Sequence, residues 1–202
     1  MSSTSRPRFR VAYVIGSLAQ GSINRKLARA LVELAPADVE LREAPIAGLP
    51  LYNYELDKAF PEPARAFKRA IVEADAVLLI TPEYNRSIPG SLKNAIDWAS
   101  RPYGDNAFAG KPTAVIGTSP GKVGTAVAQQ HLKGVMNYCD ALLMNQPEAY
   151  VQFNEDAFTG DGKVSDQSLA KVLSTFMTAF RDFLRTATAS RREPASAGAS
   201  RS

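Results

Sequence analysis

The sequence predicts an α/β protein built on a five-stranded, doubly wound parallel sheet with helices on both faces. Segments with the pattern of a strand alternate with segments of helical pattern five times along the chain. The strongest strand candidates are apolar throughout, as strands covered on both faces are. The length of 202 residues fits one domain of this kind.

The first two strand–helix units fill the chain up to residue 73. Phe9–Ile15 is a short, mostly apolar run, which predicts a buried parallel strand. From Ser22 apolar residues recur at spacings of three and four, so we predict a helix that stops at Pro36. Val39–Arg42 alternates as a strand does, and after a loop rich in proline and glycine a second helix covers Pro63–Glu73.

The second half of the chain continues the alternation. Ala76–Ile80 is the most hydrophobic strand candidate, and it ends where Thr81-Pro82 begins. The remaining predicted elements are the helix Ser91–Ser100, the strand Thr113–Gly117, the helix Gly124–Cys139, the strand Ala141–Met144, which resumes near Ala149–Val151, and the helix Leu169–Leu184.

The net charge of +4 lies at the two ends of the chain. Residues 1–10 contribute +3 and residues 186–202 contribute +2, which leaves about −1 for residues 11–185. We therefore expect a flexible segment at 1–8, a folded domain at 9–185 and a disordered tail at 186–202. No aromatic residue interrupts the charges of the tail, so we expect no nucleic-acid partner.

The scarcity of cysteine and histidine excludes several kinds of chemistry. Cys139 and His131 are the only residues of their types, so the chain has neither a disulfide nor the ligands of a zinc site. No stretch of 18 apolar residues is present, so we expect no membrane association. The N-terminus lacks the apolar core of a signal peptide, so we expect a cytoplasmic protein.

The loop after the first strand, Gly16–Asn24, has the composition of a phosphate-binding loop. Its backbone N–H groups, together with the side chains of Ser17, Ser22 and Asn24, can surround a phosphate at a helix N-terminus. It matches neither the dinucleotide fingerprint G-x-G-x-x-G nor the nucleotide-triphosphate loop. An ordinary turn with a serine cap remains open as the alternative.

The loop after the third strand, Thr81–Gly90, forms a rigid wall because it holds two prolines within ten residues. Tyr84 can lie against a flat ring, while the backbone of residues 83–85 reads the polar edge of that ring. An equally good use of Tyr84 is as an anchor at a protein interface.

The loop after the fourth strand, Gly117–Gly124, has glycines that allow close approach of a ligand to the backbone. It also matches G-x-S-x-G, the nucleophile elbow of α/β-hydrolases, with Ser119 as the serine. The only histidine, His131, follows within the next helix, and no acidic residue lies between the two. This geometry disfavours a catalytic triad and leaves a serine hydrolase as a minor alternative.

Taken together, the three loops resemble those of the NADPH-dependent FMN reductase family, within the flavodoxin-like fold. The branch most similar in its motifs is that of bacterial soluble quinone and chromate reductases. The resemblance covers about Val11 to Phe183 and differs at Ala19, where the family usually has arginine. The matching segments are Gly16-Ser17-Leu18 with Ser22-x-Asn24, then Pro82-Glu83-Tyr84-Asn85-x-Ser87-Ile88-Pro89-Gly90, and Leu92-Lys93-Asn94-Ala95-Ile96-Asp97-Trp98.

The resemblance implies the strand order 2-1-3-4-5 and non-covalently bound FMN, with Ser17, Gln20, Ser22 and Asn24 at its phosphate. It also implies a homodimer or a dimer of dimers, in which Tyr84 and Trp98 are candidates for the contact between chains; for Trp98, simple packing in the core is an equally good alternative, given its position on the helix. The cofactor-binding residues that it implies are Ser17, Leu18, Ala19, Gln20, Gly21, Ser22, Ile23, Asn24, Pro82, Glu83, Tyr84, Asn85, Arg86, Ser119 and Gly121.

The activity expected from the resemblance is two-electron, ping-pong transfer from NADPH or NADH to a small-molecule acceptor. Quinones, azo compounds and chromate-type oxyanions are the acceptor classes. We expect no catalytic side chain and no metal, because atom N5 of the flavin accepts the hydride. Arg86 or Lys122 is a candidate for contact with the 2′-phosphate of NADPH.

Two further alternatives to a reductase remain open. One is a flavodoxin-like electron carrier without its own NAD(P)H oxidation, although the near-neutral charge of residues 11–185 weighs against it. The other is a relative that keeps the fold but binds no FMN.

Overall fold

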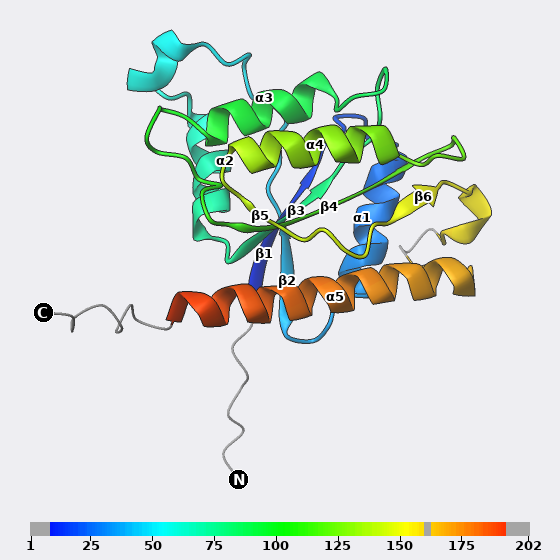
Figure 1. The fold of residues 1–202 in the computed structure, drawn as a ribbon. Coiled ribbons are helices and arrows are strands. Elements are labelled where there is room, and N and C mark those ends of the chain that lie inside the picture. The colour runs from blue at the N-terminus through cyan, green and yellow to red at the C-terminus, as the bar shows by residue number, and fades with distance from the viewer. Residues whose placement is uncertain (1–8, 160–162, 193–202) are drawn as a thin grey trace, which may run out of the picture.

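The computed structural model describes residues 9–159 and 163–192. It contains a parallel sheet with the order β2-β1-β3-β4-β5, and a sixth strand also pairs with β4. This confirms the predicted fold class and strand order (Figure 1). The strands are β1 (Phe9–Ile15), β2 (Val39–Glu43), β3 (Ala76–Ile80), β4 (Pro112–Ser119), β5 (Leu142–Leu143) and β6 (Tyr150–Gln152).

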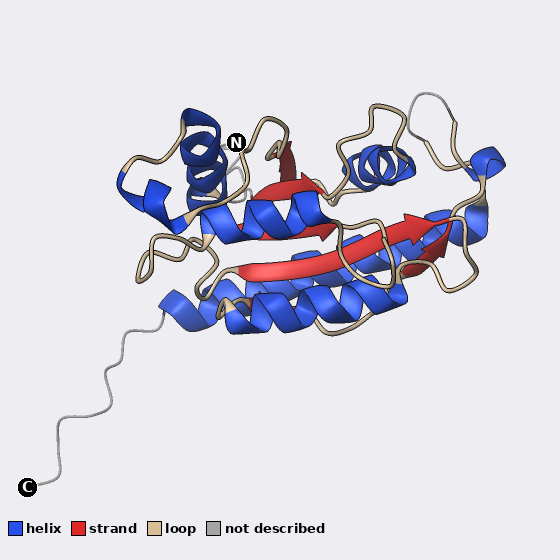
Figure 2. Ribbon diagram, turned by 90° about the horizontal axis from the view of Figure 1, so that it is seen from above, coloured by secondary structure: helices blue, strands red, loops and turns tan. Residues whose placement is uncertain are grey.

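Five α-helices cover the two faces of the sheet (Figures 1 and 2). Side chains of α1 and α5 share one buried cluster with the sheet, and those of α2, α3 and α4 share the other. The strands buried between these two clusters are the apolar runs that the sequence indicated. The helices are α1 (Ile23–Glu33), α2 (Glu62–Glu73), α3 (Gly90–Ala99), α4 (Ala126–Tyr138) and α5 (Gln167–Arg192).

Two short 3₁₀ helices, Tyr54–Lys58 and Glu155–Ala157, were not predicted from the sequence. Each begins with an asparagine, Asn53 or Asn154, whose side-chain oxygen accepts a hydrogen bond from the backbone two residues on. Such local turns have no hydrophobic period, so pattern analysis does not detect them.

The fifth strand is divided in two, as the resumption near Ala149–Val151 predicted. β5 pairs with the beginning of β4, at Pro112 and Thr113, whereas β6 pairs with its end, at Gly117–Ser119. The same flank of β4 is therefore covered twice, and β6 supports the carboxyl end where the third loop begins.

The last helix continues beyond residue 185, where the sequence predicted the folded domain to end. α5 extends to Arg192, because Ala187 is still buried and the hydroxyl of Thr188 donates to the carbonyl of Leu184. The expected tail at 186–202 is thus helical in its first seven residues. The expected flexible segment 1–8 and residues 193–202 lie outside the described residues.

Trp98 is fully buried, so of its two predicted roles packing in the core is confirmed and contact between two chains is wrong. Its indole N–H donates to the carbonyl of Pro50 at 2.7 Å, and its ring meets Tyr52 and Phe60 edge-on. The tryptophan therefore fixes the loop between β2 and α2 to α3.

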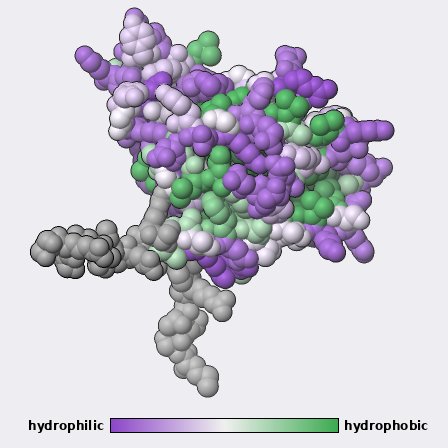
Figure 3. Space-filling view, in the orientation of Figure 1, coloured by the Kyte–Doolittle hydropathy of each residue, from purple (hydrophilic) through white to green (hydrophobic). Residues whose placement is uncertain are grey.

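The surface is mixed in polarity. Figure 3 shows hydrophilic residues interspersed with smaller hydrophobic areas on one face. In the described parts of the chain, no helix is long and apolar enough to cross a membrane.

Candidate active site

Three loops meet at the carboxyl edge of the sheet, where β1, β3 and β4 end. In the parallel register Ile15 lies beside Ile80, and Ile80 lies beside Ile116. The ladder continues one step into the loops, since the N–H of Gly16 donates to Ile80 and that of Thr81 donates to Ile116. The structure therefore brings together the three segments that the sequence singled out.

The first loop leaves hydrogen-bond donors free at the N-terminus of α1. Ser22 is the N-cap residue, yet its hydroxyl makes no capping bond. Across the described residues no partner accepts the backbone N–H groups of Gln20, Gly21, Ile23 and Asn24. The first turn of α1 contains no acidic side chain. These donors and the helix dipole suit an anion with several acceptor oxygens.

The remaining side chains of this loop divide between the core and the surface. Ser17 is buried, and its hydroxyl oxygen accepts a bond from the N–H of Ala19 at 3.3 Å. This contact shapes the turn that leads into α1. Leu18, Ala19 and Gln20 are exposed and Ile23 is half-buried.

The glycines at this edge are of two kinds: some are required by close packing, and others border open space. A Cβ at Gly117 would lie 2.0 Å from the carbonyl oxygen of Thr81, so the chain itself requires glycine there. A Cβ at Gly21 would meet nothing within 4 Å, and one at Gly121 would meet only the Ser119 hydroxyl at 3.6 Å. Neither Gly21 nor Gly121 has a positive φ, so neither packing nor backbone conformation requires a glycine at these positions, and both leave the backbone accessible.

Asn24 does not point its side chain at the anion site. It is 1% exposed, and its amide donates to the carbonyl of Thr118 and accepts from the N–H of Thr118, both at 3.0 Å. Both polar groups of the side chain are satisfied, so the side chain clamps α1 to β4, and only the backbone N–H of Asn24 is left to face the anion site. Sequence analysis missed this because the two residues are 94 positions apart.

The second loop contains a tight turn at Tyr84–Ser87. Tyr84 and Ser87 exchange two backbone hydrogen bonds, and the residues between them, Asn85 and Arg86, have φ values of 52° and 62°. This is a type I′ arrangement, which costs on the order of 1 kcal/mol for each non-glycine residue. Pro82 is buried at the start of the loop, while Tyr84 stays 53% exposed. Strain of this kind is typical of functional loops.

Glu83 turns away from the loop and caps α4. One carboxylate oxygen accepts from the N–H groups of Val127 and Ala128, each at 3.1 Å, and the other accepts from Arg86 at 3.0 Å. No sequence signal connects Glu83 with a helix that begins more than 40 residues later.

In the third loop the groups of a serine hydrolase are not assembled. The hydroxyl of Ser119 donates to the carbonyl of Gly124 at 2.5 Å, and Ser119 itself is the last residue of β4. His131 instead contacts the hydroxyl of Ser87, with Nδ1 and Oγ 3.2 Å apart. A nucleophile elbow needs its serine at a strained turn and bonded to histidine, so this arrangement does not support that alternative.

Charged groups near α4 are paired. Lys133 and Gln130 donate to Glu148 at 2.7 Å, and the bond from Lys133 is the largest cause that lowers the pKa of Glu148 to about 2. Within residues 9–159 and 163–192, no cluster of histidine, cysteine and carboxylate side chains could hold a metal ion.

Comparison with known proteins places this arrangement in a family. Residues 9–156 match the family model of NADPH-dependent FMN reductases. The chain is 51% identical to a 2-hydroxy-1,4-benzoquinone reductase of a Burkholderia species, over 87% of this chain and 96% of that enzyme. It is 44% identical to a quinone reductase of Pseudomonas putida, over 88% of this chain and 95% of that enzyme.

A solved structure agrees with these sequence relatives. The flavoenzyme NAD(P)H:(acceptor) oxidoreductase FerB of Paracoccus denitrificans is 47% identical and superposes with a TM-score of 0.85, covering 88% of this chain and 98% of that one. The resemblance drawn from the three loops is thereby confirmed, together with FMN as cofactor. The chain belongs to the NADPH-dependent FMN reductase family of oxidoreductases.

Proposed function

We propose that the protein uses FMN to pass two electrons from NAD(P)H to quinones. The observation that carries this proposal is the set of unpaired donors at the start of α1, formed by the Ser22 hydroxyl and the N–H groups of residues 20, 21, 23 and 24. The quinone class is taken from the similar enzymes of Burkholderia and Pseudomonas, whose names specify quinones.

The residues present fit an FMN molecule at this edge. The phosphate would be held by the donors at the start of α1, in a loop that has no cation of its own. The absence of arginine at Ala19 leaves the backbone and the helix dipole as the main source of affinity. The ring would be lined by the backbone of residues 82–86 and approached by Ser119 and Gly121.

The protein contributes orientation instead of acid–base catalysis. FMN, when bound, supplies the two-electron chemistry. The candidate acid–base side chains are already engaged, since Glu83 caps α4, Ser119 bonds to Gly124 and His131 contacts Ser87. The work left to the chain is to position the ring, offer backbone donors to it and exclude water from one of its faces.

We further propose that a second copy of the chain completes the pocket. Each of the three loops presents one large apolar side chain to solvent, and these are Leu18, Tyr84 and Val123, each more than half exposed. An isologous contact would cover such side chains and close an otherwise open rim. Light scattering should give a mass of at least twice 21.8 kDa, and a monomer at micromolar concentration contradicts the proposed second copy.

The flavin assignment is tested with Ser22→Ala. Because Ser22 makes no capping bond, its loss should leave thermal unfolding of the apoprotein unchanged. It should weaken FMN binding about tenfold, the effect of one hydrogen bond to a charged group. Unaltered FMN affinity would remove Ser22 from the site.

The activity itself is tested by anaerobic mixing of the FMN-loaded protein with NADPH or NADH. A reductase bleaches the flavin within seconds, and added quinone restores the colour. A flavodoxin-like carrier would need a separate reductase, and a protein that binds no FMN would be colourless. We also propose a cytoplasmic location, where NAD(P)H is available and the single cysteine stays reduced.

A further inference from the structure

We propose that Glu83 is a positioning residue, which fixes the ring-lining turn of the pocket to α4 without touching the cofactor. The inference rests on the proposed function, because the turn matters only if residues 82–86 line FMN. The contacts that support it are all within the chain and are independent of any ligand.

The carboxylate of Glu83 is enclosed, and both of its oxygens accept hydrogen bonds from the chain. Its side chain is 8% exposed, whereas its partner Arg86 is 72% exposed. One oxygen takes two backbone N–H groups from the first turn of α4, and the other takes Arg86. Both oxygens are engaged within the chain and the side chain is almost fully enclosed, so we infer that Glu83 acts on the pocket through its own backbone.

The helix has no other cap. Thr125 occupies the N-cap position of α4 without a capping bond, and its hydroxyl oxygen accepts from the side chain of Gln129 instead. The first turn of α4 contains no acidic residue. A carboxylate from another segment therefore satisfies two unpaired N–H groups and faces the positive end of the helix dipole.

The turn at Tyr84–Ser87 has a strained backbone, so contacts from outside the turn are needed to stabilise it. Asn85 and Arg86 both adopt left-handed backbone conformations, and Arg86 is neither glycine nor asparagine. Glu83 precedes this turn and is bonded to Val127 and Ala128, while Ser87 ends it and contacts His131. His131 lies one helical turn beyond Val127 and its contact is exposed, so the enclosed bonds of Glu83 are the main link between α4 and the turn.

The consequence concerns cofactor affinity. With Glu83 directed toward α4, the following residue, Tyr84, is directed outward, and the main chain of 82–86 is placed relative to β1 and β4. Without the carboxylate the strained turn can relax and shift the donors that face the ring. We expect weaker FMN binding and an altered flavin spectrum, with the phosphate loop unchanged.

The experiment compares Glu83→Gln with Glu148→Gln. Glu148 is a matched control, because it is also a carboxylate bonded to α4, through Lys133 and Gln130, but it is not part of the turn. Apoprotein is titrated with FMN, the visible spectrum of the complex is recorded, and thermal unfolding of each apoprotein is measured. Glu83→Gln should raise the Kd for FMN about tenfold or more and shift the visible spectrum, while Glu148→Gln should change it less than about twofold.

A second variant separates positioning from helix stability. Ala126→Asp, added to Glu83→Gln, returns a negative charge to the first turn of α4 from within the helix. Recovery of thermal stability without recovery of FMN affinity supports the proposal. Joint recovery of both, or an unchanged Kd in Glu83→Gln, overturns it. A wild-type protein without FMN affinity would overturn the proposed function itself.

Discussion

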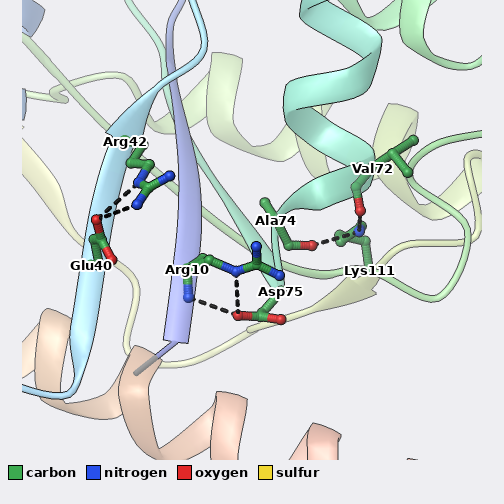
Figure 4. Close-up of polar contacts among 7 residues, drawn as sticks. All are labelled: Arg10, Glu40, Arg42, Val72, Ala74, Asp75 and Lys111. Carbon is green, nitrogen blue, oxygen red and sulfur yellow. Dashed lines mark hydrogen bonds and ion pairs between the residues drawn. The ribbon is translucent and has the colours of Figure 1, made fainter. Parts of the chain in front are cut away.

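The two edges of the same sheet are built in opposite ways. At the amino edge charged side chains pair with one another or with backbone groups, as the close-up in Figure 4 shows. The backbone N–H of Arg10 donates to Asp75 at 2.8 Å, and the ammonium of Lys111 donates to the carbonyls of Val72 and Ala74 at the end of α2. At the carboxyl edge the hydroxyl of Ser22 and several N–H groups have no partner among the described residues.

The two edges differ in what their polar groups do: some stabilise the fold, and others are left unpaired. Lys111 lies at the C-terminus of α2 and Glu83 at the N-terminus of α4, so each charge interacts favourably with a helix dipole. Both side chains are bonded to backbone groups of the same chain. The start of α1 differs from these two helix ends, because no side chain caps it and its first turn contains no acidic residue. Unpaired polar groups cost free energy unless water or a ligand satisfies them, so this is where a ligand gains most. Both edges belong to one parallel sheet, yet the unpaired donors described above lie at the carboxyl edge.

The largest effect is expected where the carboxyl edge is packed most tightly. Gly117→Ala would place a Cβ 2.0 Å from the carbonyl of Thr81 and should lower the free energy of unfolding by about 3 kcal/mol. Urea unfolding measures this, with Gly21→Ala as the control. Gly21 has open space around it, so that variant should keep its stability and lose FMN affinity. Equal stability losses in both variants would erase the distinction between packed and open glycines.

A smaller effect is expected from Asn24→Ala. The change leaves the N–H and carbonyl of Thr118 unsatisfied in a buried site, which should cost about 2 kcal/mol of stability. FMN affinity, compared at a temperature where both proteins are folded, should fall less than in Ser22→Ala. If Asn24→Ala were instead fully stable and unable to bind FMN, its side chain would contact the phosphate after all.

At the amino edge a pH-dependent effect is expected from Asp38. Burial raises the pKa of Asp38, but the hydrogen bond from Arg185 and the charges of Arg185 and Arg181 outweigh it, so the pKa lies below 3.8. Its contribution is therefore complete above about pH 3.8 and is lost as pH falls through the lowered pKa. Asp38→Asn should cost about 1 kcal/mol at pH 7, since Arg185 is half exposed, and progressively less as the pH falls through the lowered pKa of Asp38. Unfolding across this range checks it, and FMN affinity at pH 7 should not change.

The smallest effects are expected from His131→Ala and Ser119→Ala in ester hydrolysis. Their side chains bond to Ser87 and to Gly124, not to each other, so neither variant should alter the cleavage of p-nitrophenyl esters from its background level. NADPH–quinone turnover in His131→Ala should stay within about twofold of wild type, because that contact is exposed. Esterase activity that both substitutions abolish would restore the hydrolase alternative.

Local patterns predicted most of the fold and part of the site. The uniform hydrophobicity of Ala76–Ile80 and the helical periods of α1 to α4 are properties of neighbouring residues, so they can be read along the chain. The same holds for the loops, because a serine and glycine just before a helix expose donors wherever that helix packs. The family followed from these loops, and its matched segment begins in β1 and ends after β6.

Contacts across long sequence separations were decided only by the tertiary structure. Whether Asn24 meets a ligand or Thr118, and whether Glu83 faces a ring or caps α4, depends on which elements the sheet places side by side. Tryptophan is common at protein interfaces, but Trp98 lies in the core because the loop at Pro50 packs over it. α5 continues beyond residue 185 because Ala187 is buried there. The sequence alone determined which polar groups lie at the carboxyl edge. The tertiary structure decided which of them are hydrogen-bonded within the chain, because a polar group pairs with whichever partner the packed elements bring within hydrogen-bond distance.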